Sequence, residues 1–129
     1  MGRRYDHMDV RVRRLAEVRA FYETLLPALG FTRRMDIPGW LQFEAVNSDE
    51  ATEFFGVTES PLHVPNESRI AFWADSAHEV DRLAEIALRA GARHVDGPAN
   101  YTGPGYYAFF FEDPSGNRLE ICHRNKKAT

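Results

Sequence analysis

Residues 106–120, Tyr-Tyr-Ala-Phe-Phe-Phe-Glu-Asp-Pro-Ser-Gly-Asn-Arg-Leu-Glu, decide the fold of this chain. The aromatic run at 106–112 predicts a strand, because aromatic residues favour a pleated surface that is half buried. Asp, Pro, Ser and Gly at 113–116 predict a tight turn, and a last strand is predicted at 117–122. The end of the chain is therefore a pair of strands joined by a turn.

Working back from this pair, the sequence predicts a strand at 69–74, a helix that stops at Gly91 and a short strand at 93–95. The first half shows a strand at 7–12 and an amphipathic helix at 15–29, in which Pro27 is expected to bend or end the last turn. Three strand-like runs follow it, at 31–35, 40–45 and 52–57.

The two halves repeat each other. His7 and Glu17 recur 62 residues later as Arg69 and Glu79, and Gly30 recurs 61 residues later as Gly91. A β-α-β-β-β module is thus used twice, and two such copies can enclose a site between them. We expect one α+β domain over residues 1–129, with module one at about 5–58, a linker at about 59–67 and module two at about 68–124.

Composition narrows the class of protein. The 129 residues are 43% hydrophobic and 27% charged, which is typical of a globular domain that needs no metal or disulfide to hold its core. The net charge of −3 is spread along the chain and argues against a nucleic-acid partner, and no apolar run approaches the roughly 20 residues of a membrane span. Cys122 is the single cysteine, which agrees with a reducing, cytoplasmic location.

The repeat and the Asp-Pro-Ser-Gly-Asn-x-x-Glu stretch ending at Glu120 resemble the vicinal oxygen chelate superfamily of glyoxalases, bleomycin and fosfomycin resistance proteins and extradiol dioxygenases. The resemblance runs from about His7 to His123. It implies two β-α-β-β-β modules whose curved sheets form a ligand cup with the helices outside. Members commonly hold a divalent metal through the first strand of each module and a carboxylate on the last strand, although metal-free members occur.

Carried over position by position, the resemblance places a metal ligand at His7 and another at Glu120, with Glu53 as the candidate for the last strand of module one. The second module departs from the pattern. Arg69 stands where a histidine ligand is usual, and a guanidinium stays protonated and does not bind metals. Two hypotheses stay open: a divalent zinc, nickel or iron ion held by His7, Glu120 and Glu53, or a metal-free cluster of His7, Arg69 and Glu120.

Strand alternation adds further candidates for the cup. It places Asp9 on the face of His7, and it predicts that Trp73, Phe55, Tyr106 and Phe110 line the cup as apolar walls. A carboxylate in such a place needs a partner, and Arg69 is the expected partner of Glu120.

Two classes of function follow. The first is a glyoxalase-like lyase or isomerase that binds a small oxygenated metabolite and moves a proton, with His7, Glu120 and Arg69 as catalytic residues. The second is a protein that sequesters a drug or metabolite without chemistry, as bleomycin resistance proteins do. A dioxygenase is disfavoured, since Arg69 removes one of the two histidines that its iron needs. A homodimer is compatible with either class.

Overall fold

The computed structural model describes residues 2–102 and 105–125, which form two compact units, Met1–Val64 and Pro65–Thr129. We call them unit 1 and unit 2. The boundary between them falls inside the segment that the sequence predicts as a linker.

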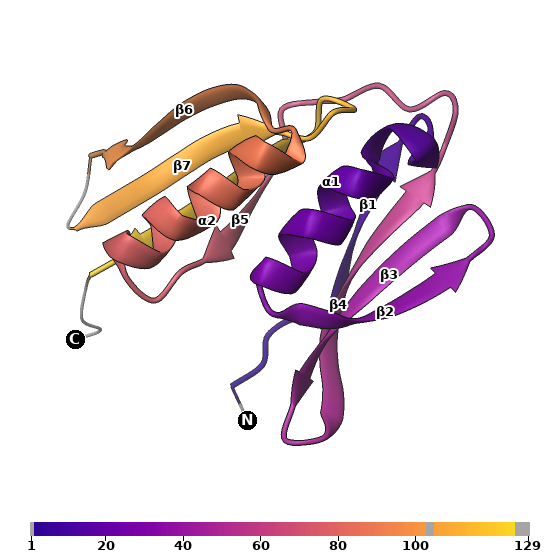
Figure 1. Ribbon diagram of the computed structural model, residues 1–129, viewed down its shortest axis with the longest axis horizontal. Coiled ribbons are helices and arrows are strands. Elements are labelled where there is room, and N and C mark those ends of the chain that lie inside the picture. The colour runs from indigo at the N-terminus through magenta and orange to yellow at the C-terminus, as the bar shows by residue number, and fades with distance from the viewer. Residues whose placement is uncertain (1, 103–104, 126–129) are drawn as a thin grey trace. The chain divides into compact units, whose positions relative to one another are not determined.

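Each unit has the order strand, helix and three strands (Figure 1). Unit 1 contains β1 (His7–Val12), α1 (Leu15–Ala28), β2 (Phe31–Ile37), β3 (Trp40–Asn47) and β4 (Glu50–Glu59). Unit 2 contains β5 (Arg69–Trp73), α2 (Ala77–Ala90), β6 (Arg93–Asn100), β7 (Tyr106–Glu112) and β8 (Arg118–Arg124). The α+β class and the duplicated module are confirmed.

The sheets share one topology. Their strand orders are β1-β4-β3-β2 and β5-β8-β7-β6. In each, the first strand pairs in parallel with the last, and the other pairs are antiparallel. Strand β6 runs five residues beyond the predicted 93–95, through two register shifts against β7.

One helix covers one face of each sheet, and the alternation of the strands decides which side chains meet it. We call the other side the helix-free face. The core of unit 1 lies between α1 and its sheet and contains Val18, Phe21, Tyr22, Leu25, Leu26, Leu41, Phe43, Phe55 and Val57. The core of unit 2 lies between α2 and its sheet and contains Val80, Leu83, Ala84, Ala87, Phe109, Phe111, Leu119 and Ile121. The polar phase of each strand is therefore left to the helix-free face.

The two helices begin differently. Ser76 caps α2, where its hydroxyl accepts a hydrogen bond from the Glu79 amide at 3.0 Å, and Gly91 ends that helix in the left-handed region with φ 114°. The side chain of Arg14 does not cap α1. Instead the Glu59 carboxylate, from the end of β4, accepts a hydrogen bond from the Leu15 amide at 2.9 Å. A negative charge there also stabilises the positive end of the helix dipole.

The turn that joins β7 and β8 is built around Asp113, which is fully buried. Its carboxylate accepts hydrogen bonds from the amides of Ser115 and Asn117, at 2.8 and 2.9 Å, and from the Asn117 side chain at 3.0 Å. Gly116 closes the turn with φ 95°, a conformation that favours glycine. This turn fixes the register in which Phe110 faces Glu120.

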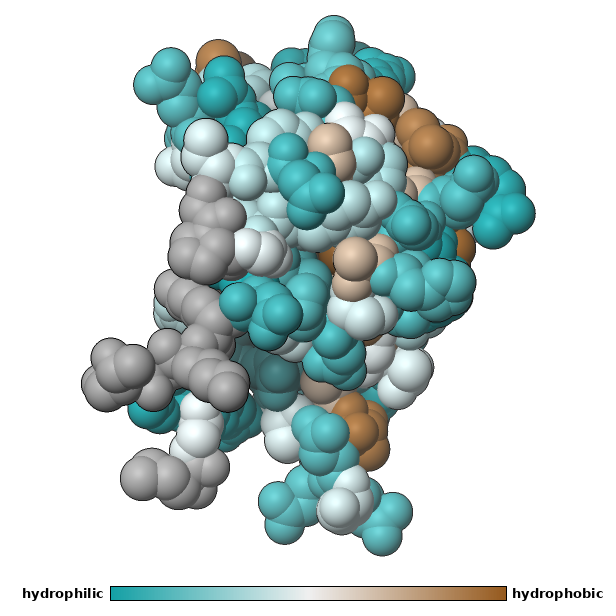
Figure 2. All heavy atoms as spheres, turned by 90° about the vertical axis from the view of Figure 1, so that its left-hand side faces the viewer, coloured by the Kyte–Doolittle hydropathy of each residue, from teal (hydrophilic) through white to brown (hydrophobic). Residues whose placement is uncertain are grey.

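Hydrophilic side chains prevail on the face of the molecule that Figure 2 shows, and hydrophobic ones lie there in small separate groups. Among the described residues, neither helix has the length and hydropathy to cross a membrane.

Candidate functional site

The helix-free face of unit 2 carries a carboxylate bonded to a phenol. Glu120 is 6% exposed, and its Oε2 accepts a hydrogen bond from the Tyr106 hydroxyl. Burial and the neighbouring Glu120 raise the pKa of Tyr106 to about 12, because both disfavour the phenolate. Tyr106 therefore stays protonated and remains a donor across the physiological pH range.

Aromatic rings surround this pair. Tyr101, just beyond β6, packs edge-on against Phe110 with 5.0 Å between ring centroids, and lies 6.0 Å from the ring of Tyr106. Its hydroxyl donates to Asp96 at 3.0 Å. Burial and that carboxylate raise the pKa of Tyr101. Tyr106, Phe110 and Glu120 are thus brought together as the sequence predicts.

Two guanidinium groups lie over these rings. The Arg69 guanidinium is 4.8 Å from the centroid of Phe110, and that of Arg124 is 3.7 Å from the centroid of Tyr106. Both distances fall within the range of a cation–π interaction. The expectation that Arg69 pairs with Glu120 is therefore corrected. Glu120 takes its hydrogen bond from Tyr106, while Arg69 packs on Phe110.

Cys122 shares the face of Glu120, two residues further along β8, and is 7% exposed. Burial raises the pKa of its thiol to about 11, and the negative charge of Glu120 adds to the shift. A thiolate is the nucleophilic form of cysteine, so Cys122 is a buried apolar group at neutral pH and not a nucleophile.

This pKa predicts slow alkylation. At about pH 8, a thiol with a pKa near 11 holds roughly 100-fold less thiolate than one with a pKa near 9. We expect iodoacetamide to modify Cys122 of the folded chain at least about 100-fold more slowly than that of the urea-unfolded chain, followed by mass spectrometry. The difference should narrow as the pH rises towards 11. Equal rates at pH 8 would show that the thiol is neither buried nor shifted.

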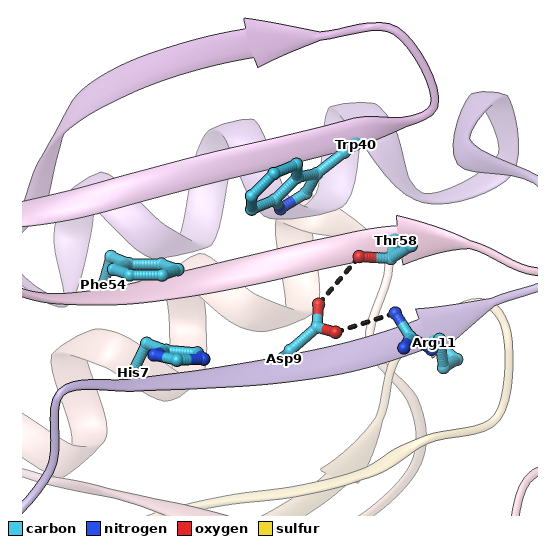
Figure 3. A pocket seen from close by; sticks show the side chains of 6 residues that line it. All are labelled: His7, Asp9, Arg11, Trp40, Phe54 and Thr58. Atoms are coloured by element: carbon cyan, nitrogen blue, oxygen red, sulfur yellow. Dashed lines mark hydrogen bonds and ion pairs between the residues drawn. The ribbon is translucent and has the colours of Figure 1, made fainter.

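The helix-free face of unit 1 carries a cavity of about 420 Å³, lined by His7, Asp9, Arg11, Trp40, Phe54 and Thr58 (Figure 3). His7 stacks on Phe54 with 4.5 Å between ring centroids and 3° between ring planes. Its Nδ1 lies 2.8 Å from a carboxylate oxygen of Asp6. Asp9 accepts hydrogen bonds from Thr58 at 2.8 Å and Arg11 at 2.7 Å. The placement of His7 and Asp9 on one face agrees with the alternation of β1.

Phe55 of unit 1 lies on the other face, and this prediction is corrected. Phe55 is 1% exposed and packs 5.8 Å from Tyr22 of α1, so it belongs to the core. Phe54 lies beside His7 in the place predicted for Phe55, because Phe54 is paired with His7 in the register of β1 and β4. Glu53 lies where the register of β3 and β4 shifts, so strand alternation does not decide which face it takes. A hydrogen bond with Thr52 lowers the pKa of Glu53.

Trp73 lies at the end of β5 and is 57% exposed. Its ring centroid is 5.1 Å from that of His123, and its indole N–H donates to Asp75 at 2.9 Å. These contacts hold the indole at the end of the strand. Strand alternation places Trp73 on the predicted face of β5, but its ring contacts are with His123 and not with the aromatic group around Tyr106.

The sequence analysis missed Trp40, Phe54 and Thr58 in unit 1, and Arg124 in unit 2. Trp40 and Thr58 have a signal, since they are a cross-strand pair once the hairpin of β3 and β4 is in register. Tyr101 lies beyond the end of β6, in a segment of glycine and proline that precedes the aromatic strand in the sequence.

Comparison of the units shows which residue of unit 1 corresponds to Glu120. His7 and Arg69 each begin the first strand of their unit. Two residues on, Asp9 pairs with Gly56 in unit 1, and Ala71 pairs with Glu120 in unit 2. The counterpart of Glu120 is therefore Gly56 and not Glu53.

The residues present do not fit the metal that the resemblance implies. Of the four corresponding positions, His7 and Glu120 carry ligating side chains, whereas Gly56 has none and Arg69 has a permanent positive charge that opposes a cation. Within each unit, moreover, the part of the chain that the structure describes brings together no three His, Cys, Asp or Glu side chains able to hold a metal ion. The approach of His7 to Arg69 and Glu120, which lie in different units, stays a prediction.

The model of the glyoxalase/bleomycin resistance protein/dioxygenase superfamily matches residues 4–121, and the chain belongs to this superfamily. Among solved structures, it resembles a glyoxalase/bleomycin resistance protein from Albidiferax ferrireducens T118. The two share 22% identity over 94% of this chain and 98% of that one, with a TM-score of 0.78. A fosfomycin resistance protein from Mesorhizobium loti shares 20% identity over 97% and 95% of the two chains, with a TM-score of 0.66. At these identities the likeness concerns the fold. Among curated proteins, none matches the chain.

Proposed function

We propose that this chain binds a small carboxylate with a neighbouring hydroxyl or carbonyl oxygen on the helix-free face of unit 2, without a resident metal ion. The observation that carries the proposal is the position of Arg69, stacked on Phe110 beside the buried pair of Glu120 and Tyr106. Stacking uses the flat face of a guanidinium, whereas its five N–H donors lie in the plane of the group. Arg69 therefore keeps the fork that binds a carboxylate through two hydrogen bonds.

The other groups on this face suit the rest of such a molecule. Arg124, fixed over Tyr106, adds a second positive charge for an anion. The ring surfaces of Tyr101 and Phe110 offer apolar contact to a short carbon skeleton. Glu120 is an acceptor for a ligand hydroxyl, and its negative charge turns the ligand's own carboxylate towards the arginines. The arrangement favours an acid with oxygens on adjacent carbons.

The test is calorimetric titration of the chain with lactate, glycerate, malate and pyruvate, before and after treatment with EDTA. We expect at least one acid to bind, with an affinity that EDTA leaves unchanged. Arg69→Gln should weaken binding about tenfold to 100-fold, the effect of a lost charge-assisted hydrogen-bonded pair. Arg89→Gln is the matched control, because it removes the same charge from the last turn of α2, on the other face of the sheet.

The proposal is wrong if none of the acids binds, or if Arg89→Gln weakens binding as much as Arg69→Gln does. Loss of binding after EDTA would instead support the hypothesis that a divalent metal ion is needed.

A second candidate is proton transfer at a carbon next to a carbonyl, the chemistry of a lyase or isomerase. The observation that favours it is the hydrogen bond from Tyr106 to Glu120. When Glu120 takes up the proton of the substrate, Tyr106 can turn its single O–H from that carboxyl group to the developing oxyanion. Proton NMR of pyruvate in D₂O with the chain separates the two functions. If the chain speeds the exchange of the pyruvate methyl protons and Glu120→Gln abolishes this effect, catalysis is supported. If the protons exchange at the rate seen in buffer, the chain only binds the acid.

A further inference from the structure

Gly56 lets two of the side chains that line the cavity of unit 1, Trp40 and Asp9, lie close against β4. Gly56 lies opposite Asp9, where unit 2 has Glu120. A Cβ atom at Gly56 would stand 3.0 Å from Nε1 of Trp40 and 3.1 Å from Oδ1 of Asp9. Such distances are closer than ordinary van der Waals contact, so only glycine fits here without moving one of these side chains. We call the space beside Gly56, lined by the six cavity residues, the ring slot.

Aromatic rings form the walls of the ring slot. Trp40 stands over it from β3, and the stacked rings of His7 and Phe54 stand beside it on β1 and β4 (Figure 3). The volume of about 420 Å³ is within the range of small-molecule sites. Offset or edge contacts with several rings favour a planar aromatic molecule over a branched aliphatic one.

The charges in the ring slot are already paired. The Asp9 carboxylate accepts one hydrogen bond from Thr58 and one from Arg11, whose positive charge lies 2.7 Å away. An anion would be repelled by Asp9, and a cation would compete with Arg11. The slot therefore favours an uncharged ligand, in contrast to the face of Arg69 and Arg124.

One polar group of the slot lacks a partner. The indole Nε1–H of Trp40 is buried and makes no hydrogen bond to the described part of the chain. A buried donor left unsatisfied costs about 1 to 3 kcal/mol. No group in the described part of the chain accepts a hydrogen bond from this N–H, so a ligand acceptor would recover this energy once the indole turns slightly towards it.

We propose that the ring slot binds an uncharged planar aromatic ring that carries a hydrogen-bond acceptor, and that Trp40 Nε1–H donates to this acceptor. The inference goes beyond the proposed function, since it concerns the other unit and a ligand of different charge. Either can fail without the other.

The experiment compares quinoline with naphthalene, which has the same shape and no ring nitrogen, by NMR of the ¹⁵N-labelled chain. The chain has two tryptophans, so two indole N–H cross-peaks appear, and Trp73→Phe assigns the remaining one to Trp40. We expect quinoline to shift the Trp40 proton downfield in a saturable way and to bind at least about tenfold more tightly than naphthalene. The Trp73 cross-peak should move little, because its N–H already donates to Asp75.

Two variants test the roles of Gly56 and Trp40 separately. Gly56→Ala should weaken quinoline binding at least about tenfold, because its methyl group would push Trp40 or Asp9 out of place in the wall of the slot. Trp40→Phe keeps a ring and removes the donor, so quinoline and naphthalene should then bind equally, as read from backbone amide shifts of β4. Amide dispersion shows that each variant is folded.

The proposal is overturned if quinoline leaves the Trp40 cross-peak unmoved, or if naphthalene binds as tightly as quinoline to the unaltered chain. A preference for quinoline that survives in Trp40→Phe would equally contradict it.

Discussion

Asp113→Ala is expected to lower the free energy of unfolding by about 3 kcal/mol or more. The Asp113 carboxylate is fully buried and accepts three hydrogen bonds, from the amides of Ser115 and Asn117 and from the Asn117 side chain. Alanine removes this acceptor from the buried Ser115 amide and from two part-buried donors of Asn117, and the loss of such an acceptor costs about 1 to 3 kcal/mol for a buried donor. Urea denaturation measures the change as a lower midpoint at an unchanged slope.

Two companion variants sharpen this test. Asp113→Asn keeps a carbonyl oxygen that can accept hydrogen bonds from the amides. Its free energy of unfolding should therefore lie between that of the wild type and that of Asp113→Ala. Asp75→Ala is the control, because Asp75 is exposed and accepts one hydrogen bond, from exposed Trp73, and its removal should change stability by less than about 1 kcal/mol. If Asp113→Ala and Asp75→Ala prove equally mild, Asp113 does not organise the turn.

Tyr106→Phe is expected to lower the free energy of unfolding by about 2 kcal/mol. The change removes the hydroxyl that donates to Glu120 and leaves a buried carboxylate without that partner. Its ring is kept, so the contacts with Tyr101 and Arg124 remain and the loss reports on the hydrogen bond. Thermal or urea unfolding measures it.

The neighbouring residue supplies the control. Tyr107 also donates to a carboxylate, Asp81 at 2.6 Å, but this pair is exposed. Tyr107→Phe should therefore cost less than about 1 kcal/mol. Adding Glu120→Leu to Tyr106→Phe should restore part of the lost stability, because removing both polar partners leaves no buried charge behind. A double variant less stable than Tyr106→Phe would contradict this explanation.

Local patterns were enough to predict most of the fold. Leu15 to Leu26 recur at helical spacing and α1 follows them, and Gly91 ends α2 in the left-handed conformation that its position predicts. The turn at Asp113 is equally local, since its hydrogen bonds span at most four residues. Where the partners of a residue are near in sequence, the local sequence pattern is enough to predict the structure.

Long-range features were out of reach. Glu59 caps a helix that begins 44 residues before it, and no pattern around Leu15 points to it. Strand β6 continues through Gly97 and a cis Pro98, residues that normally mark the end of a strand. Its extension depends on pairing with β7, which overrides the local preference.

The candidate site shows the same division. Phe54 and Phe55 are equally apolar, so alternation alone leaves open which of them faces His7, and the register of β1 and β4 decides it. One signal was present and not used. Phe55-Gly56-Val57 has the apolar flanks of Leu119-Glu120-Ile121, which would have aligned Gly56 with Glu120 and excluded Glu53.

The parallel pairing of β1 with β4 determines when this face of unit 1 can assemble during synthesis. β1 is an edge strand, and its hydrogen-bonded neighbour in the sheet is the strand that is made last in the unit. Until Glu59 has left the ribosome, His7, Asp9 and Arg11 therefore lie on a segment with no strand to join, although α1 and the hairpin of β2 and β3 already have their local partners. Contacts this distant in sequence form slowly, because a long loop must close before they do. The strand that carries His7 is thus the first of unit 1 to be translated and the last to be ordered.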